Sequence, residues 1–141
     1  MTAEFEVRRE ESPPLDVVLR LYKSAGWWEG EDRDEVLEDI VRGAACFAAA
    51  YAGGEMIGMG RVLSDGVSDA YIQDLGVAFA WRKRGVGSAI VVFLRNWCVG
   101  RGFGWIGLVA MPGTVPFYEH LGFEPLPGHV PMRLPRNGKH G

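Results

Sequence analysis

A glycine-containing turn between a strand pattern and a helix pattern is the feature of this sequence that most limits its fold. Residues 70–77, AYIQDLGV, have the composition of a strand, and residues 89–97, AIVVFLRNW, are apolar enough for a buried helix. Between them, residues 82–88 read RKRGVGS. At a strand-to-helix turn the first backbone N–H groups of the helix lack intrahelical acceptors, so an anion can bind there. The segment therefore predicts either a phosphate-binding turn or a solvated basic turn.

Two common phosphate-binding motifs do not fit this turn. The dinucleotide-binding motif G-x-G-x-x-G needs a third glycine, and the P-loop needs a lysine after its glycines, whereas Lys83 precedes Gly85 and Gly87. Nucleic acid is not an expected partner, because the net charge is -3. In addition, three cations followed by an apolar helix form no extended basic stripe.

The rest of the sequence predicts one mixed α/β domain over residues 1–141. The predicted strands are residues 4–10, a hairpin over 46–66 that turns at Gly53-Gly54, and residues 69–79, 104–111, 122–126 and 130–135. The predicted helices are residues 12–26 with Ser12 as N-cap, and residues 31–44, 85–99 and 114–122. The tail, residues 136–141, is expected to be frayed.

Composition and cysteine usage predict a cytoplasmic protein. The first residues carry acids and no apolar core, so a signal peptide is not expected. No apolar run approaches the roughly 20 residues of a membrane span, so no membrane partner is expected. Cys46 and Cys98 lie in apolar surroundings and are expected to be buried free thiols. The histidines have no metal-ligand spacing, so no metal site is expected.

Two motifs resemble those of a known family. Residues 77–94, VAFAWRKRGVGSAIVVFL, contain Arg82-x-x-Gly85-x-Gly87, which resembles the Q/R-x-x-G-x-G/A motif for acetyl-CoA in the GNAT superfamily of N-acyltransferases. Residues 115–123, VPFYEHLGF, resemble that family's second signature. The chain is similar to the family over essentially its whole length, and also to a small bacterial branch that resembles plant serotonin N-acetyltransferases. The resemblance implies a mixed, mostly antiparallel sheet with helices on both faces and a splayed strand pair that binds the cofactor.

The resemblance also assigns roles toward acetyl-CoA, the expected co-substrate. The amides of Arg84 through Ser88 would hold its pyrophosphate, and the expected cofactor-binding residues in this turn are Arg82, Lys83, Arg84, Gly85, Val86, Gly87 and Ser88. The backbone groups of Leu75, Gly76 and Val77 would bind the pantetheine and the acetyl carbonyl, because backbone donors polarise a thioester oxygen without titrating.

One tyrosine matches the catalytic position of the family. Tyr118 would protonate the leaving thiolate, because a phenol is a donor near neutral pH. Phe117 beside it would contact the cofactor. Without the motif, Tyr118 would instead be interpreted as a core aromatic beside Phe117 and Phe123. Met111 departs from the family pattern, because an asparagine often stands seven residues before the tyrosine.

The part of the site that would bind the acceptor of the acetyl group is expected to be aromatic. Trp27 and Trp28 lie in the loop between the first two predicted helices, as either a lid over the core or an aromatic wall for an acceptor. Strand alternation predicts that Tyr71 and Gln73 share a face with Leu75 and Val77. The resemblance implies that Tyr71 and Gln73 line the acceptor site, because bases of the family commonly occupy their positions.

The general base is not identified by the sequence. Asp74 is expected on the opposite face of its strand, where a structural hydrogen-bonding role is favoured over that of a base. Glu29, Glu31 and Asp32 are the alternatives, and a solvated acidic helix start is the other interpretation of these three.

The leading function is acetyl transfer from acetyl-CoA to the primary amine of a small, aromatic or apolar acceptor. Direct attack in a ternary complex is expected, because no cysteine or serine nucleophile has a histidine partner. The alternative is a non-catalytic module that senses acyl-CoA or binds a partner. A homodimer is also a reasonable expectation for this fold.

Overall fold

The computed structural model describes residues 4–135, in two compact units that divide between Leu108 and Val109. The second unit holds α4 (Val115–His120). The elements of the first unit are β1 (Glu6–Arg9), α1 (Leu15–Ser24), α2 (Asp34–Gly43), β2 (Cys46–Ala52), β3 (Glu55–Ser64), β4 (Asp69–Val77), a 3-10 helix (Phe79–Trp81), α3 (Val86–Gly100) and β5 (Trp105–Gly107). The single domain expected over residues 1–141 stays a prediction, and the tail 136–141 lies outside the described residues.

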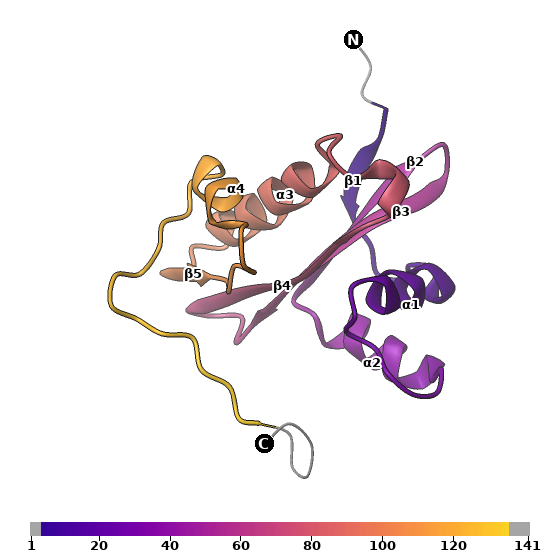
Figure 1. Ribbon diagram of the computed structural model, residues 1–141, viewed down its shortest axis with the longest axis horizontal. Helices are drawn as coiled ribbons and strands as arrows, with labels where there is room; N and C mark the ends of the chain where they lie inside the picture. The colour runs from indigo at the N-terminus through magenta and orange to yellow at the C-terminus, as the bar shows by residue number, and fades with distance from the viewer. Residues whose placement is uncertain (1–3, 136–141) are drawn as a thin grey trace. The chain divides into compact units, whose positions relative to one another are not determined.

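The first unit is built on one sheet with the strand order β1-β2-β3-β4-β5. Its pairs are antiparallel except β4 and β5, which run parallel. Figure 1 shows α3 along one face of this sheet and α1 and α2 on the other. The predicted mixed, mostly antiparallel sheet with helices on both faces is therefore confirmed. The hairpin between β2 and β3 turns at Gly53-Gly54 as predicted, with both glycines at positive φ.

Three of the predicted strands differ from the structure. The pattern over 104–111 forms only β5, and within residues 4–135 the segments 122–126 and 130–135 do not form strands, so both of those predictions are wrong. Their prolines lack the N–H that a strand ladder needs. These residues are Pro125, Pro131 and Pro135.

Helices α1 and α2 bury their apolar stripes against the sheet. Val18, Leu21 and Tyr22 follow helical spacing in α1, and all three are buried. From α2, Leu37 joins the same cluster. The predicted Ser12 cap is wrong, because the N-cap of α1 is Pro14, whose fixed φ of -63° suits the approach to a helix.

Helix α3 is seated on the opposite face of the sheet by two glycines of β3. A Cβ atom at Gly60 would lie 2.9 Å from both Ile90 Cγ2 and Leu94 Cδ1, and one at Gly58 would lie 2.9 Å from Ile90 Cδ1. The missing side chains let α3 approach the sheet closely. This contact holds α3 against the sheet along β3. The neighbouring strand, β4, leads into the glycine turn.

Both cysteines are buried and free, as predicted. Burial raises the pKa of the Cys46 thiol to about 11 and also raises the pKa of Cys98. The two side chains are therefore neutral, apolar parts of the core at physiological pH.

A β-bulge in β4 changes the faces on which its side chains lie. Met59 of β3 pairs with Gly76 and Arg61 pairs with Gln73, so β4 carries one extra residue in this stretch. Asp74, inside the bulge, has a left-handed φ of 59°. The prediction that Leu75 and Val77 share a face with Tyr71 and Gln73 is wrong beyond Gln73. Leu75 lies on the α3 side of the sheet, where its Cδ1 atom would be 3.9 Å from a Cβ atom at Gly60.

The bulge places the Asp74 carboxylate on the α1 side of the sheet, together with Gln73. Its Oδ2 accepts a hydrogen bond from Arg61 Nε at 2.6 Å and another from the Tyr22 hydroxyl at 2.8 Å. The side chains of Arg61 and Asp74 are only 16% and 19% exposed. Burial, and then Asp74, raise the pKa of Tyr22, so its hydroxyl remains a donor. The carboxylate therefore ties α1, β3 and the bulge together.

Replacing Gly60 with alanine should destabilise the first unit. The new methyl group would overlap Ile90 and Leu94, an overpacking that costs about 1–3 kcal/mol. The measurement is the midpoint of urea unfolding. Gly104→Ala is the matched control, because its Cβ would meet no atom within 4 Å and its φ is outside the left-handed region. Equal midpoints for the two variants would contradict the close seating of α3.

Replacing Arg61 with methionine should cost more than breaking a surface ion pair. Asp74 would then be a largely buried carboxylate with only Tyr22 as partner, and we expect a loss of about 2 kcal/mol, below the full value for a completely buried pair. The control is Arg20→Met, which breaks the exposed pair of Arg20 with Asp16 and should change stability by less than about 0.5 kcal/mol. Thermal unfolding of both variants at pH 7 tests this, and equal losses would contradict it.

Candidate functional site

The glycine turn predicted from the sequence leads into the N-terminus of α3. Gly85, at φ 88°, is the N-cap of this helix, and Lys83 also has a left-handed φ of 62°. That region of backbone conformation is small but open to L-residues. The first helical hydrogen bond runs from Ala89 N to Gly85 O at 3.0 Å. The N–H groups that precede Ala89 lie at the positive end of α3, where a phosphate would be stabilised.

Two basic side chains of the turn, those of Arg82 and Arg84, are held by neighbouring groups. Arg82 Nε donates to the carbonyl of Val77 at 3.2 Å, which ties the turn to the end of β4. Arg84 Nη2 pairs with Glu4 Oε1 at 2.8 Å, and its guanidinium lies 4.1 Å from the centre of the Trp81 ring. The guanidinium of Arg84 is therefore already engaged by neighbouring groups, and the role of its amide toward a pyrophosphate stays a prediction.

The end of β4 offers backbone groups beside this turn. Gly76 and Val77 pair with β3, whereas β5 pairs with β4 only along Asp69, Ala70 and Tyr71. In the described part of the chain, the β5-facing edge of β4 beyond Tyr71 therefore has no strand partner. This is the splayed pair that the fold prediction implies, and Leu75, Gly76 and Val77 lie along its open part.

The two tryptophans of the α1–α2 loop differ in their surroundings. Trp28 packs against the core and donates its indole N–H to Glu31 O at 3.2 Å, so it acts as a lid. Trp27 is 38% exposed and meets Tyr22 edge-on, with ring centres 6.0 Å apart. Both rings therefore meet Tyr22, and Trp27 is the more exposed of the two.

A second aromatic pair lies where β4 meets β5. The rings of Tyr71 and Trp105 are nearly parallel, with centres 6.4 Å apart. A Cβ at Gly107 would lie 2.0 Å from the Trp105 ring, so only glycine leaves room for this stack. Sequence reasoning missed Trp105, since its strand pattern gives a face but no partner.

Sequence reasoning also missed Tyr22 and Arg61, the partners of Asp74. In the sequence, Tyr22 appears only as part of a helical apolar stripe. No local pattern predicts that its hydroxyl reaches β4. Of the candidate bases in the α1–α2 loop, Asp32 pairs with Lys23 Nζ at 2.7 Å. Asp74 already accepts two hydrogen bonds, in agreement with the structural role favoured for it.

The second unit contains the predicted catalytic tyrosine. Tyr118 lies on α4 with its ring edge-on to Phe117 at 4.9 Å and to Phe123 at 6.1 Å between centres. Its carbonyl accepts a hydrogen bond from Phe123 N at 3.0 Å. Burial raises the pKa of the Tyr118 phenol, so the group stays protonated at neutral pH and can serve as a donor. Met111, in this unit, is exposed.

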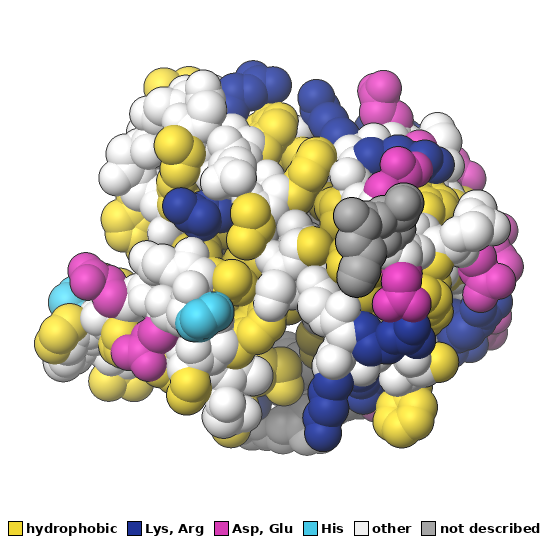
Figure 2. Space-filling model, turned by 90° about the horizontal axis from the view of Figure 1, so that it is seen from above, with side chains coloured by type: hydrophobic (Ala, Val, Ile, Leu, Met, Phe, Trp, Pro, Cys, Tyr) yellow, Lys and Arg dark blue, Asp and Glu magenta, His cyan; other side chains and the backbone are white. Residues whose placement is uncertain are grey.

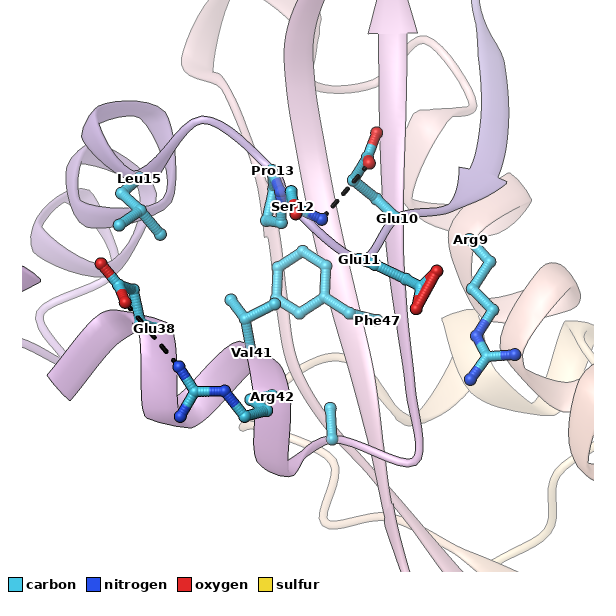
Figure 3. Close-up of a pocket in the computed structure, with 11 residues that line it drawn as sticks. Arg9, Glu10, Glu11, Ser12, Pro13, Leu15, Glu38, Val41, Arg42 and Phe47 are labelled. Carbon is cyan, nitrogen blue, oxygen red and sulfur yellow. Dashed lines mark hydrogen bonds and ion pairs between the residues drawn. The ribbon is translucent and has the colours of Figure 1, made fainter. Parts of the chain in front are cut away.

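A cavity of the first unit lies away from these residues. It has a volume of about 520 Å³, and Figure 3 shows charged side chains such as Glu38 and Arg42 around apolar Phe47 and Val41. It adjoins the end of β1 and the start of β2, whereas the start of β1 lies near the glycine turn through the ring contact of Phe5 with Trp81. None of the predicted site residues is among those that line it.

On the face drawn in Figure 2, basic and acidic side chains are intermixed. Across residues 4–135, no group of three or more histidine, cysteine, aspartate or glutamate side chains is placed to hold a metal ion. The helices within that range are all too short or too polar to cross a bilayer.

Comparison with known proteins agrees with this arrangement. The chain is 39% identical over 70 residues to GCN5-related N-acetyltransferase 2, chloroplastic, of Arabidopsis thaliana, a match that covers 50% of the chain and 27% of that relative. It is 26% identical to a GNAT-family acetyltransferase of Streptococcus pneumoniae, with 94% of this chain and 99% of that chain covered and a TM-score of 0.74. Glucosamine-6-phosphate N-acetyltransferase of Arabidopsis thaliana shares the fold at 16% identity and a TM-score of 0.72, over 95% and 98% of the two chains. Because residues 8–123 also match the acetyltransferase (GNAT) family, the chain belongs to that family.

Proposed function

We propose that this protein is an N-acetyltransferase that moves an acetyl group from acetyl-CoA to the primary amine of a small acceptor. The observation that carries the proposal is the left-handed turn at Lys83 and Gly85, which presents the N-terminus of α3 next to the open edge of β4. The N-terminus of α3 suits a pyrophosphate, and the open edge of β4 suits the extended amide chain of pantetheine. Family membership supports the same donor.

The proposed reaction is a direct attack. The neutral amine nitrogen attacks the thioester carbon, the carbonyl oxygen gains negative charge, and backbone N–H groups along residues 75–77 stabilise that charge. As the C–S bond breaks, Tyr118 gives its proton to the thiolate sulfur. The amine nitrogen loses a proton to a base or a water molecule, and Glu29, Glu31 and Asp32 remain the candidates for this role.

The proposed acceptor is a small amine with an apolar or aromatic body. The partly exposed Trp27 and the Tyr71–Trp105 stack offer flat apolar surfaces on the first unit. Trp28 contributes indirectly, as a lid packed on the core, and Gln73 is the polar group proposed to orient the acceptor. A small-molecule acceptor is supported by the shared fold of glucosamine-6-phosphate N-acetyltransferase.

A second candidate function is a non-catalytic acyl-CoA sensor. Met111 stands at the position of the frequent family asparagine, and the base is unassigned, which together favour this alternative. The two functions differ in turnover. Release of free CoA thiol from acetyl-CoA across a panel of aromatic and aliphatic amines indicates the enzyme, and binding without release indicates the sensor.

The proposed cellular setting is the cytoplasm. It is supported by two free thiols that are kept as parts of the core. The proposed partners are acetyl-CoA and the amine, with no nucleic acid or membrane.

Binding of CoA to the glycine turn should be visible as thermal stabilisation. CoA at one hundred times its Kd adds about 2.7 kcal/mol, which raises Tm by several degrees. Gly85→Val should remove this rise, because a branched side chain at φ 88° distorts the turn. Gly66→Val is the matched control, since Gly66 has φ 80° and equally open surroundings in the β3–β4 turn. Loss of the CoA response in both variants, or in neither, would contradict the site.

Tyr118→Phe should lower kcat by about 100-fold while KM for acetyl-CoA changes by less than about twofold. The reason is that the variant keeps the ring but loses the proton donor. Because burial raises the pKa of Tyr118, the difference between wild type and variant should persist from pH 6 to pH 9. Tyr51→Phe, which removes a phenol that donates to Glu10, is the control and should keep full turnover. An unchanged kcat for Tyr118→Phe would rule out this role.

A further inference from the structure

The cavity beside Phe47 has no role in the proposed acetyl transfer. Its volume of about 520 Å³ falls within the range of about 300–1,000 Å³ that small-molecule sites have in proteins. It lies where α2, the β1–α1 connection and the start of β2 meet, as Figure 3 shows. All of the residues that line it belong to the first unit. The side chains of this lining indicate what kind of molecule the cavity would hold.

The floor of the cavity is apolar. Phe47 of β2 and Val41 of α2 belong to the hydrophobic core and are 3% and 8% exposed. Pro13 is also buried, and Leu15 packs against the same core. A ligand in the cavity would therefore rest on apolar surface, which favours a molecule with a hydrocarbon group.

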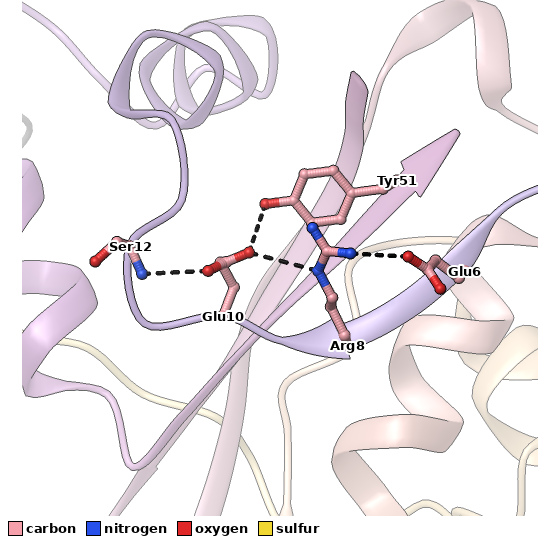
Figure 4. Close-up of polar contacts among 5 residues, drawn as sticks. All are labelled: Glu6, Arg8, Glu10, Ser12 and Tyr51. Atoms are coloured by element: carbon pink, nitrogen blue, oxygen red, sulfur yellow. Dashed lines mark hydrogen bonds and ion pairs between the residues drawn. The ribbon is translucent and has the colours of Figure 1, made fainter. Parts of the chain in front are cut away.

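One carboxylate of the lining, that of Glu10, is already used by its neighbours (Figure 4). Its Oε2 accepts a hydrogen bond from the Tyr51 hydroxyl at 2.8 Å and lies 3.6 Å from Arg8 Nε. Its Oε1 accepts a hydrogen bond from the Ser12 N–H at 3.4 Å. The bond from Tyr51, more than the others, holds the pKa of Glu10 below its ordinary value. Glu10 is therefore a fixed part of the wall and is not available to a ligand.

The charged side chains that α2 contributes are also paired. Arg42 Nη1 lies 2.7 Å from Asp39 Oδ1, and Arg42 Nη2 lies 3.7 Å from Glu38 Oε2. The second of these pairs is drawn in Figure 3. The wall that α2 forms therefore carries charges that neutralise each other.

Two oppositely charged side chains of the lining, Arg9 and Glu11, have no ion-pair partner among residues 4–135. Arg9 Nη2 donates to the carbonyl of Ala45 at 3.2 Å, and its guanidinium lies 5.7 Å from the centre of the Trp97 ring. These contacts orient Arg9 without neutralising it. Figure 3 shows Arg9 and Glu11 on the β1 side of the cavity, opposite the charged pair of α2.

A cation and a carboxylate that share one side of a cavity without pairing are complementary to a zwitterion. The carboxylate of such a ligand would accept hydrogen bonds from the guanidinium of Arg9, whose planar fork fits a carboxylate. Its ammonium group would donate to the carboxylate of Glu11. A ligand with only one of the two charges would leave the other side chain unpaired and would bind less well.

We propose that this cavity binds a free α-amino acid with an apolar side chain, at a site separate from that of acetyl-CoA. The apolar side chain of the ligand lies on Phe47 and Val41, and its two charges lie on Arg9 and Glu11. An α-amino acid fits because Arg9 and Glu11 are separated by a single residue, so they suit a ligand whose charges are close together. The proposal does not depend on the acetyl-transfer activity.

The first experiment adds L-leucine to the ¹⁵N-labelled full chain and follows amide chemical shifts. The expected changes occur at Glu11, Ser12 and Phe47 and saturate at millimolar concentration, with the glycine turn at 82–88 unaffected. Three analogues each lack one part of the ligand: 4-methylpentanoate lacks the ammonium group, 3-methylbutylamine lacks the carboxylate, and glycine lacks the apolar side chain. Each should bind at least about threefold more weakly than L-leucine.

The second experiment repeats the L-leucine titration with variants of the lining. Glu11→Gln and Arg9→Met each remove one charge and should weaken binding by about threefold. The matched controls lie outside the lining and should bind L-leucine as wild type does. Glu55→Gln removes an exposed carboxylate at the start of β3, and Arg101→Met removes the other guanidinium that packs on Trp97, at 4.6 Å. Far-UV circular dichroism establishes that each variant is folded.

Several outcomes would overturn the proposal. Shift changes centred on Trp27 and Tyr71 would show that L-leucine occupies the proposed acceptor site instead. Equal affinity for L-leucine and 4-methylpentanoate, unchanged affinity in Glu11→Gln and Arg9→Met, or no shift change at millimolar L-leucine would each refute the zwitterion site. None of these results would alter the expected binding of CoA at the glycine turn, so the two proposals fail separately.

Discussion

The carboxylate of Asp74 is the contact on which the arrangement of β4 depends. It joins Arg61 of β3 and Tyr22 of α1 at a point where β4 contains an extra residue. An aspartate with a left-handed φ is uncommon, and the two hydrogen bonds stabilise that conformation. Because each bulge residue reverses the face of everything after it, this contact determines which backbone groups of Leu75–Val77 face the open edge.

The turn after β4 depends on a second constraint, the close seating of α3 on Gly58 and Gly60. The helix is pressed against the sheet, and its N-terminus follows directly from the end of β4 through the 3-10 helix and two left-handed residues. Arg82 fastens this path by its hydrogen bond to Val77. The site proposed for CoA is therefore made of backbone, positioned by packing and a few side-chain contacts. On this proposal, the side chains of its basic residues contribute less to CoA binding than their number in the sequence suggests.

The sequence was sufficient for features that depend on local patterns. The hairpin at Gly53-Gly54, the glycine N-cap of α3 and the short helix with Tyr118 all follow from residue types a few positions apart. The sequence was insufficient for structural features that depend on contacts between residues far apart in the chain. The bulge at Asp74 depends on Arg61 and Tyr22, so the simple alternation predicted for β4 is wrong beyond Gln73.

The strand patterns near the C-terminus illustrate the same limit. Apolar alternation over 130–135 describes a strand, but a strand also needs a partner edge, and alternation does not identify one. The aromatic pair of the candidate functional site shows the same limit. Tyr71 was expected from its strand, whereas the Trp105 ring that stacks on it comes from a segment more than thirty residues later.

The central claim is that backbone N–H groups at the start of α3 hold the pyrophosphate of CoA. It is tested most directly by titrating ¹⁵N-labelled protein with CoA and following amide chemical shifts. The account predicts that the largest changes occur at Arg84 through Ser88, with smaller ones along Leu75–Val77. It would be contradicted by changes concentrated around the cavity at Glu38, Val41 and Phe47, with the glycine turn unaffected.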